Sequence, residues 1–180
     1  LQAVRTTFRW TGHEMGVMVA LDPLGDCLPP QLIERIYSSL NKVKRIGHSV
    51  RVALARRVVP ILELRVVLPA HTLRSQVEQS LHELFSSRVM KDGKLGYFHP
   101  DCSTFGDGIH ISELVSAACQ HLGKRILSVE VVELHRPDLG ASQELEDGLL
   151  RLYRQEIVRF DNNPLLPRFG KLEIELVGGH

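Results

Sequence analysis

The chain has 180 residues, and its 22 Lys and Arg are nearly balanced by 21 Asp and Glu. This balance gives no net field that would attract nucleic acid or an anionic membrane surface. No apolar run approaches the ~20 residues that a bilayer-spanning helix needs, and the first ten residues lack the apolar core of a signal peptide. We therefore expect neither nucleic-acid binding nor membrane insertion.

The three cysteines are Cys27, Cys102 and Cys119. Their spacing is neither paired nor metal-like, and an odd number leaves at least one of them free. A reducing compartment is the simpler interpretation. The length suits one domain or two small ones, and it is sufficient to bury a hydrophobic core.

The first third of the chain predicts three strands and one helix. Residues 15–21 form the first strand, and Pro30 can open a helix over residues 30–44, where apolar residues recur at helical spacing. Residues 49–54 alternate as a half-buried strand requires, and residues 62–68 follow as another strand after a basic turn.

Two more helices and one more strand follow. The helices are predicted over about residues 72–87 and 112–122, with Gly123 placed to end the second of them, and the strand covers residues 127–131. The resulting order, β-α-β-β-α-(α)-β, is typical of an α+β fold of the ferredoxin-like type. Residues 153–160 and 171–177 add two strands as a C-terminal β extension.

The same features predict the organisation of the chain. Residues 1–14 are expected to be an N-terminal lead-in from a larger chain, because the sequence begins with Leu rather than Met. Residues 15–136 form the ferredoxin-like domain, residues 137–152 a polar linker or arm, and residues 153–180 the C-terminal β extension.

Residues 96–106, GYFHPDCSTFG, are the most distinctive stretch of the chain. Proline fixes its own φ and glycine adopts angles closed to other residues, so the run indicates a loop of specified shape. Tyr97, Phe98 and Phe105 either anchor this loop to a core or offer apolar area to a partner, and the sequence leaves both readings open.

Several side chains in this loop and just after it could carry chemistry. His99, Asp101, Cys102 and His110 are zinc-ligand types, but their spacing matches no recurrent zinc pattern. The chain also has no G-x-S-x-G elbow and no phosphate-binding loop. We therefore predict a hydrogen-bonded loop, with no metal, no cofactor, no catalytic residue and no enzymatic activity.

Basic residues gather between positions 42 and 57. Acidic residues elsewhere balance them, and no aromatic platform for nucleic acid bases interleaves with them. This cluster is expected to be a solvated or subunit-facing surface.

The distinctive loop belongs to a longer series of motifs. GYFHPDCSTFG is followed by ISELVSAA, SVEVVELHR, ELEDGLLRL and EIVRFDNNPLLPRFGKLEIELVGG, and it is preceded by VMVALDPLG, RIGHSVRV and RRVVPILELRVVLP. In this order the motifs resemble the C-terminal part of baseplate assembly proteins. These form the baseplate J-like, wedge-forming family of contractile phage tails and phage-tail-like injection systems. Where that family has TFGQ and an apolar pair, this chain has TFGDGIH, a departure that bears on the local contacts of the loop and not on the resemblance.

The resemblance implies a structural role rather than a reaction. The chain would be a module of a baseplate wedge subunit that assembles with other wedge, hub and sheath-proximal proteins. It would be made in the bacterial cytoplasm and reside in the baseplate of a tail or injection particle, oligomeric in the assembly. The candidate interface or loop anchors are Tyr97, Phe98, His99, Asp101 and Phe105.

One alternative comes from the predicted fold. Ferredoxin-like domains often bind small molecules at sheet edges or helix termini, so a small-molecule-binding regulatory module is a second hypothesis. The glycine-rich contact turn that it needs is partly present in DPLGD, residues 22–26.

Overall fold

The computed structural model describes residues 1, 3–23, 28–137, 143–161 and 170–180. Predictions for Cys27, for the DPLGD turn beyond residue 23, for linker residues 138–142 and for residues 162–169 lie outside these ranges. Within them the chain forms helices and several sheets, which confirms the α+β class. No helix in this part of the chain is both long and apolar enough to cross a membrane.

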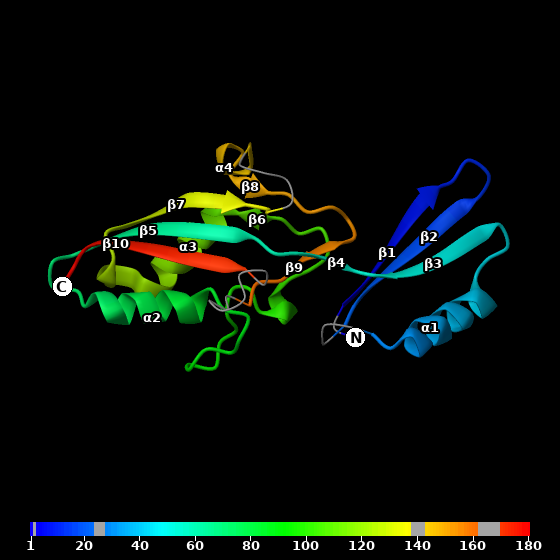
Figure 1. Ribbon diagram of the computed structural model, residues 1–180, viewed down its shortest axis with the longest axis horizontal. Helices are drawn as coiled ribbons and strands as arrows, with labels where there is room; N and C mark the ends of the chain where they lie inside the picture. The colour runs from blue at the N-terminus through cyan, green and yellow to red at the C-terminus, as the bar shows by residue number, and fades with distance from the viewer. Residues whose placement is uncertain (2, 24–27, 138–142, 162–169) are drawn as a thin grey trace.

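The first sheet has the strand order β1-β2-β3, and α1 connects β2 to β3 (Figure 1). Its elements are β1 (Ala3–Trp10), β2 (Met15–Asp22), α1 (Pro30–Val43) and β3 (His48–Leu54). β1 and β2 form an antiparallel hairpin, while β2 and β3 are parallel neighbours. Although the apolar residues of α1 recur at helical spacing, α1 contains no fully buried residue.

The second sheet has the strand order β10-β5-β7, with β5 (Ile61–Leu68), β7 (Ser128–His135) and β10 (Lys171–Gly178). Every second residue of β5 is buried, beginning at Leu62, as expected for a central strand with one covered face. The other face carries Glu63 and Arg65, and Arg65 forms ion pairs with β7 and β10. Helices α2 (Arg74–Leu84) and α3 (Ile111–Leu122) lie along the covered face (Figure 1).

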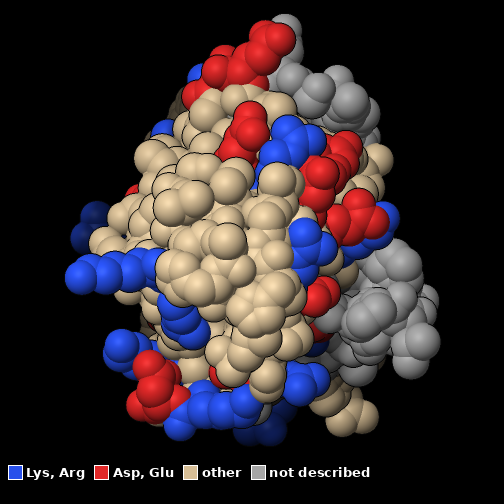
Figure 2. Space-filling model, turned by 90° about the vertical axis from the view of Figure 1, so that its left-hand side faces the viewer, with Lys and Arg blue, Asp and Glu red and all other residues tan. Residues whose placement is uncertain are grey.

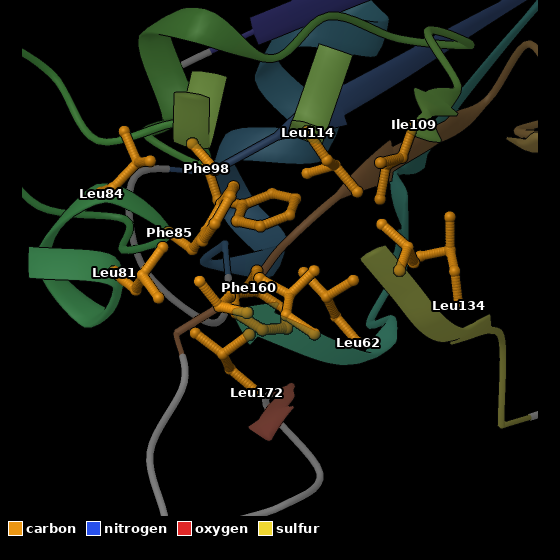
Figure 3. Close-up of a cluster of buried hydrophobic side chains, with 14 of the residues drawn as sticks. Leu62, Leu81, Leu84, Phe85, Phe98, Ile109, Leu114, Leu134, Phe160 and Leu172 are labelled. Carbon is orange, nitrogen blue, oxygen red and sulfur yellow. The ribbon is translucent and has the colours of Figure 1, made fainter. Parts of the chain in front are cut away.

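The main hydrophobic core lies between the second sheet and its two helices. Figure 3 shows side chains from β5, α2, α3 and β7 converging with the aromatic rings of Phe85, Phe98 and Phe160. Each such side chain, when fully buried, stabilises the fold by roughly 1.5–3 kcal/mol relative to exposure. The stability of the chain is therefore concentrated in its second sheet.

Short elements connect the two sheets and close the core. The strands are β4 (Arg56–Val58), β6 (Ile109–His110), β8 (Leu149–Leu150) and β9 (Glu156–Val158). The helical pieces are η1 (Pro100–Cys102), η2 (Gly123–Arg125) and α4 (Gln143–Glu146). β4 pairs in parallel with β9 between the sheets, and β6 pairs with β8 beside the second sheet, where Ile109 and Leu150 join the main core.

The ferredoxin-like topology is not confirmed. That arrangement places all four strands in one sheet, whereas here β2 and β3 lie in one sheet and β5 and β7 in another. The cause lies in residues 53–61, ALARRVVPI, which contain no Gly, Asn or Asp to reverse the chain. Where a basic turn was predicted, the chain runs on through β4 and enters the second sheet.

The division of the chain at residues 14, 136 and 152 stays a prediction, but two of its segments contain elements that the sequence analysis did not identify. Strand β1 lies within residues 1–14 and pairs along its whole length with β2. Strand β8 lies within residues 137–152, and its Leu150 is fully buried.

Unequal burial predicts unequal protection of backbone amides from hydrogen exchange. The amides of α1 should exchange at least about tenfold faster than those of α2 and α3, because local opening of α1 exposes little apolar surface. Hydrogen exchange followed by mass spectrometry measures this directly on helices of similar length. Equal protection of α1 and α3 would contradict the burial pattern.

Candidate interaction site

The loop 96–106 begins where the backbone has no room for a side chain. A Cβ on Gly96 would collide with the carbonyl oxygen of Ser86 and lie 2.9 Å from that of Arg88. The Gly96 N–H donates to Arg88 O at 2.9 Å, and the Tyr97 N–H donates to Leu84 O at 2.7 Å. The start of the loop is thereby fastened to the end of α2.

Phe98 points into the main core. It is 4% exposed, and its ring centroid lies 4.5 Å from that of Phe160 and 5.0 Å from that of Tyr97 (Figure 3). The Tyr97 and Phe98 rings meet edge to face, an arrangement that adds attraction beyond simple burial. Of the two roles left open by the sequence, Phe98 takes that of a core anchor within its own chain.

Tyr97 connects the loop to α3. Its ring packs against the core, and its hydroxyl donates to Glu113 Oε2 at 3.3 Å. Burial raises the pKa of Tyr97 well above its ordinary value, and the neighbouring Glu113 carboxylate raises it further. The phenol therefore stays protonated and serves as a hydrogen-bond donor.

His99 and Asp101 shape the turn that follows. His99 Nδ1 accepts the Asp101 N–H at 3.2 Å and caps η1, which Pro100 opens. Cys102 is exposed and has a free thiol. Among the described residues, no group of three or more His, Cys, Asp or Glu side chains is arranged to hold a metal ion. Of the ligand-type side chains noted in the sequence, His99 thus fixes a turn, whereas His110 stands at the start of α3 without a capping side-chain hydrogen bond.

Phe105 lies at the other end of the loop, between the two sheets. It is 5% exposed and packs with Ala20 of β2 and Ile157 of β9. Next to it, Gly106 has a φ of +74°, which favours glycine, and its N–H donates to Glu156 O at 2.9 Å. The loop therefore joins the main core at Phe98 to the first sheet at Phe105.

A buried ion pair lies beside this junction. Arg136 and Glu156 are 1% and 2% exposed, and two hydrogen bonds of 2.8 and 3.0 Å join the guanidinium to the carboxylate. Glu156 also accepts the Tyr153 N–H at 2.9 Å. Burial alone would raise the pKa of Glu156, but the bonds from Arg136 and Tyr153 outweigh it and hold that pKa below its ordinary value.

A second pair joins the first sheet to β4. Arg57 Nε lies 3.1 Å from Asp22 Oδ1, and its guanidinium also donates to Pro23 O at 2.9 Å. Asp22 is a buried carboxylate at the end of an apolar strand. The sequence analysis identified neither pair. A carboxylate at the end of an apolar strand is the signal that could have pointed to Asp22, but nothing in the sequence shows which cation faces it.

The first sheet is open on both faces near β1. On the apolar face Val4, Phe8 and Trp10 are 53%, 64% and 62% exposed. On the other face, the sheet and residues 153–155 border a hollow of about 830 Å³. The site as a whole thus consists of a fixed junction, which can hold two sheets at a defined angle, and an uncovered sheet beside it.

No protein-family model matches the chain, and no curated protein matches it. Among solved structures, it is similar to a chain in the cryo-EM structure of the anti-feeding prophage (AFP) baseplate, 6-fold symmetrised, with a TM-score of 0.40 and 12% sequence identity. The likeness covers 94% of this chain and 38% of that chain. This chain therefore spans well under half the length of that neighbour.

The burial of Phe98 leads to a stability prediction. Phe98→Ala should lower the free energy of unfolding by about 3–5 kcal/mol, because it leaves a cavity among Phe85, Tyr97 and Phe160. Urea unfolding followed by circular dichroism gives this value. The matched control is Phe8→Ala, at an exposed position, which should cost less than about 0.5 kcal/mol. Equal effects of the two changes would show that Phe98 is not a core residue.

The Arg136–Glu156 pair predicts a specific pattern of destabilisation. Glu156→Gln should lower the free energy of unfolding by about 3–5 kcal/mol, because it removes the carboxylate charge that faces the buried Arg136 guanidinium. Replacing both residues, as Arg136→Met with Glu156→Leu, should recover much of that loss. Additive losses in the double variant would contradict this prediction.

The pH dependence follows from the same pair. Folding lowers the pKa of Glu156. Its contribution to the free energy of unfolding is therefore complete above the ordinary glutamate pKa of 4.5, and it is lost as the pH falls through the lower pKa of the folded state. Thermal unfolding measured from pH 7 down to pH 3 should therefore show a smaller acid loss in the double variant than in the wild type. An identical acid loss in both would mean that Glu156 titrates normally in the folded state.

Proposed function

We propose that the chain is a non-enzymatic structural component of a contractile tail or injection-system baseplate, a module of a wedge subunit that assembles with neighbouring baseplate proteins. The observation that carries the proposal is the ordered series of motifs from VMVALDPLG to KLEIELVGG, which lies within residues 17–179. Motifs of this length, order and unusual composition are improbable by chance.

The positions of these motif residues in the fold support a structural role. In GYFHPDCSTFG, Gly96 fits a crowded backbone, Phe98 and Phe105 fill the core and the junction, and His99 caps a turn. The SVEVVELHR and EIVRF motifs contribute the two partners of the buried Arg136–Glu156 pair. Each of these residues thus has a structural task in positioning the sheets.

The position of Phe98 and Phe105 limits which residues can contact partners. Both were candidate interface anchors, but they are buried within their own chain. Contact energy in an assembly must come from side chains that are exposed here, and exposed apolar side chains are what a protein interface needs at its centre.

Exposed apolar side chains occur at the two opposite ends of the folded molecule. At the right of Figure 1 they lie on β1, within the first sheet. At the left end, where β5 and β10 finish, a broad uncharged surface is bordered by charged side chains (Figure 2). Exposed Leu73, Leu127 and Val177 flank the ends of α2, β7 and β10, which meet there. A module with an adhesive surface at each end is suited to link two neighbours in an assembled ring.

The partners in this proposal are the wedge, hub and sheath-proximal proteins of the same particle. The chain would be made in the bacterial cytoplasm and would be oligomeric in the assembled baseplate. Such an assembly needs fixed geometry more than chemistry, and the buried junction between the two sheets supplies it.

Deletion of the gene in a producing cell tests this function. Without the chain, tube and sheath proteins should fail to assemble into complete contractile particles, because the ring that organises them is missing. Electron microscopy of the pelleted particle fraction measures the outcome, and a tagged wild-type copy should restore the particles and be found in them by mass spectrometry. Complete baseplates in cells that lack the chain would refute the proposal.

A further inference from the structure

The outer edge of β1 is unpaired. Strand β1 lies at the end of the order β1-β2-β3, and its register with β2 runs without a bulge from Ala3 to Trp10. No backbone hydrogen bond from another described element reaches this outer edge. Natural sheets protect edge strands with bulges, prolines, short length, covering segments or charged side chains, and among the described residues β1 shows only the charges of Arg5 and Arg9. Its edge can therefore accept a further strand.

The two faces of β1 differ in chemistry. Val4, Phe8 and Trp10 lie on the apolar face, where Phe8 is opposite Val17 and Val17 is opposite Val50. α1 covers the β3 side of that face and leaves the β1 side open. An added strand with apolar side chains on this face would fill the groove of about 340 Å³ between the sheet and the end of α1.

Positive charge surrounds the edge. Arg5 and Arg9 project from the opposite face of β1, and Arg9, Arg51 and Arg154 line the hollow there. Lys44 and Arg45 border the apolar groove, and no Asp or Glu lines either depression among the described residues. The sequence has the same asymmetry, since residues 1–57 contain 9 Lys and Arg against 4 Asp and Glu, while residues 58–180 contain 13 against 17.

We propose that β1 takes up an extended segment of a different protein chain as an additional strand, and that this segment alternates apolar residues with Asp or Glu. Its apolar residues cover Val4 and Phe8, and its carboxylates face Arg5 and Arg9. Backbone hydrogen bonds along the edge supply affinity, while the charges select the partner and the register. This deepens the proposed function, on which it rests for the identity of the particle.

A second copy of this chain fits the edge less well. Pairing β1 with β1 in any register that matches the faces brings the arginines of the two strands onto one surface, and like charges across a strand pair are destabilising. The acidic edge strands of the second sheet, β7 and β10, have carboxylates engaged already, and on β7 Glu130 pairs with Arg65. Glu175 lies 2.7 Å from Arg65 Nε, and Glu173 pairs with Lys171.

Nucleic acid also fits less well than an acidic strand. Phosphates would contact the arginines on one face of β1. They would leave Val4 and Phe8 on the other face exposed and the backbone edge of β1 without added hydrogen bonds. A peptide strand satisfies the edge, the apolar face and the charges together.

The test uses a fluorescein-labelled eight-residue peptide in which glutamate alternates with valine, and a matched peptide in which lysine replaces glutamate. Fluorescence anisotropy with the whole chain should show binding of the glutamate peptide and at least about tenfold weaker binding of the lysine peptide. Hydrogen exchange should slow for amides of β1 and not for those of β10, which is also an exposed edge. Equal binding of both peptides, or no slowing in β1, would overturn the proposal.

Charge reversal supplies the control. Arg5→Glu with Arg9→Glu should reverse the peptide preference without lowering the melting temperature, because both side chains are exposed. Arg88→Glu with Lys124→Glu makes the same change in net charge away from β1 and should leave binding unchanged. An equal loss of binding in both variants would reduce the effect to net charge and refute the site.

Two further measurements exclude the other occupants. Sedimentation velocity should find the chain monomeric at micromolar concentration, and association that the Arg5/Arg9 variant abolishes would instead assign the edge to a second copy. Tighter binding of a labelled oligothymidylate than of the glutamate peptide would assign it to nucleic acid. Either result refutes the peptide proposal and leaves the deletion phenotype, which tests the baseplate role, unaffected.

Discussion

The buried bond between Arg136 and Glu156 constrains the arrangement of the two sheets. Arg136 follows β7, an edge strand of the second sheet, and Glu156 begins β9. β9 pairs with β4, the strand through which the chain leaves the first sheet. In a low-dielectric interior this pair is stable only with close geometry, so small displacements of β9 relative to β7 are costly. The angle between the sheets therefore depends on two charged side chains that are almost inaccessible to water.

The distinctive loop depends on the same strand. Phe98 packs on Phe160, just after β9, and Phe105 packs on Ile157 within it. The loop thus contacts β9 through Phe105 and the residues just after β9 through Phe98, and the Gly106 N–H donates to the carbonyl oxygen of Glu156. Its unusual composition follows from this position, since the loop has to fill two cores and cap a turn within eleven residues. The loop 96–106, which could have offered apolar area to a partner, instead joins the main core to the first sheet of its own chain.

Local patterns predicted the elements, and non-local pairing decided the topology. Alternation in β5 and helical spacing in α1 and α3 are properties of single segments, and those predictions are confirmed. The ferredoxin-like sheet was not formed, because it assumed a chain reversal in residues 53–61, where no Gly, Asn or Asp occurs. Strand β1 was missed although Val4, Phe8 and Trp10 alternate with polar residues. The loop was identified, but Phe160, which packs on Phe98, and Ile157, which packs on Phe105, lie some 50 or more residues away in sequence, and no local pattern reveals such partners.

The uneven distribution of burial would connect folding to assembly in the proposed function. The second sheet has its own core, whereas the first sheet is held mainly by Ala20 against Phe105 and Ile157, by the Asp22–Arg57 pair and by a helix without a fully buried residue. Any partner that binds the folded form of this sheet stabilises it in proportion to the logarithm of its concentration over Kd. A strand added at β1 would also bury apolar side chains that the chain alone leaves in water. If the chain assembles as proposed, the first sheet would gain its full stability only in the assembled state, and an unassembled copy would keep a loosely held end.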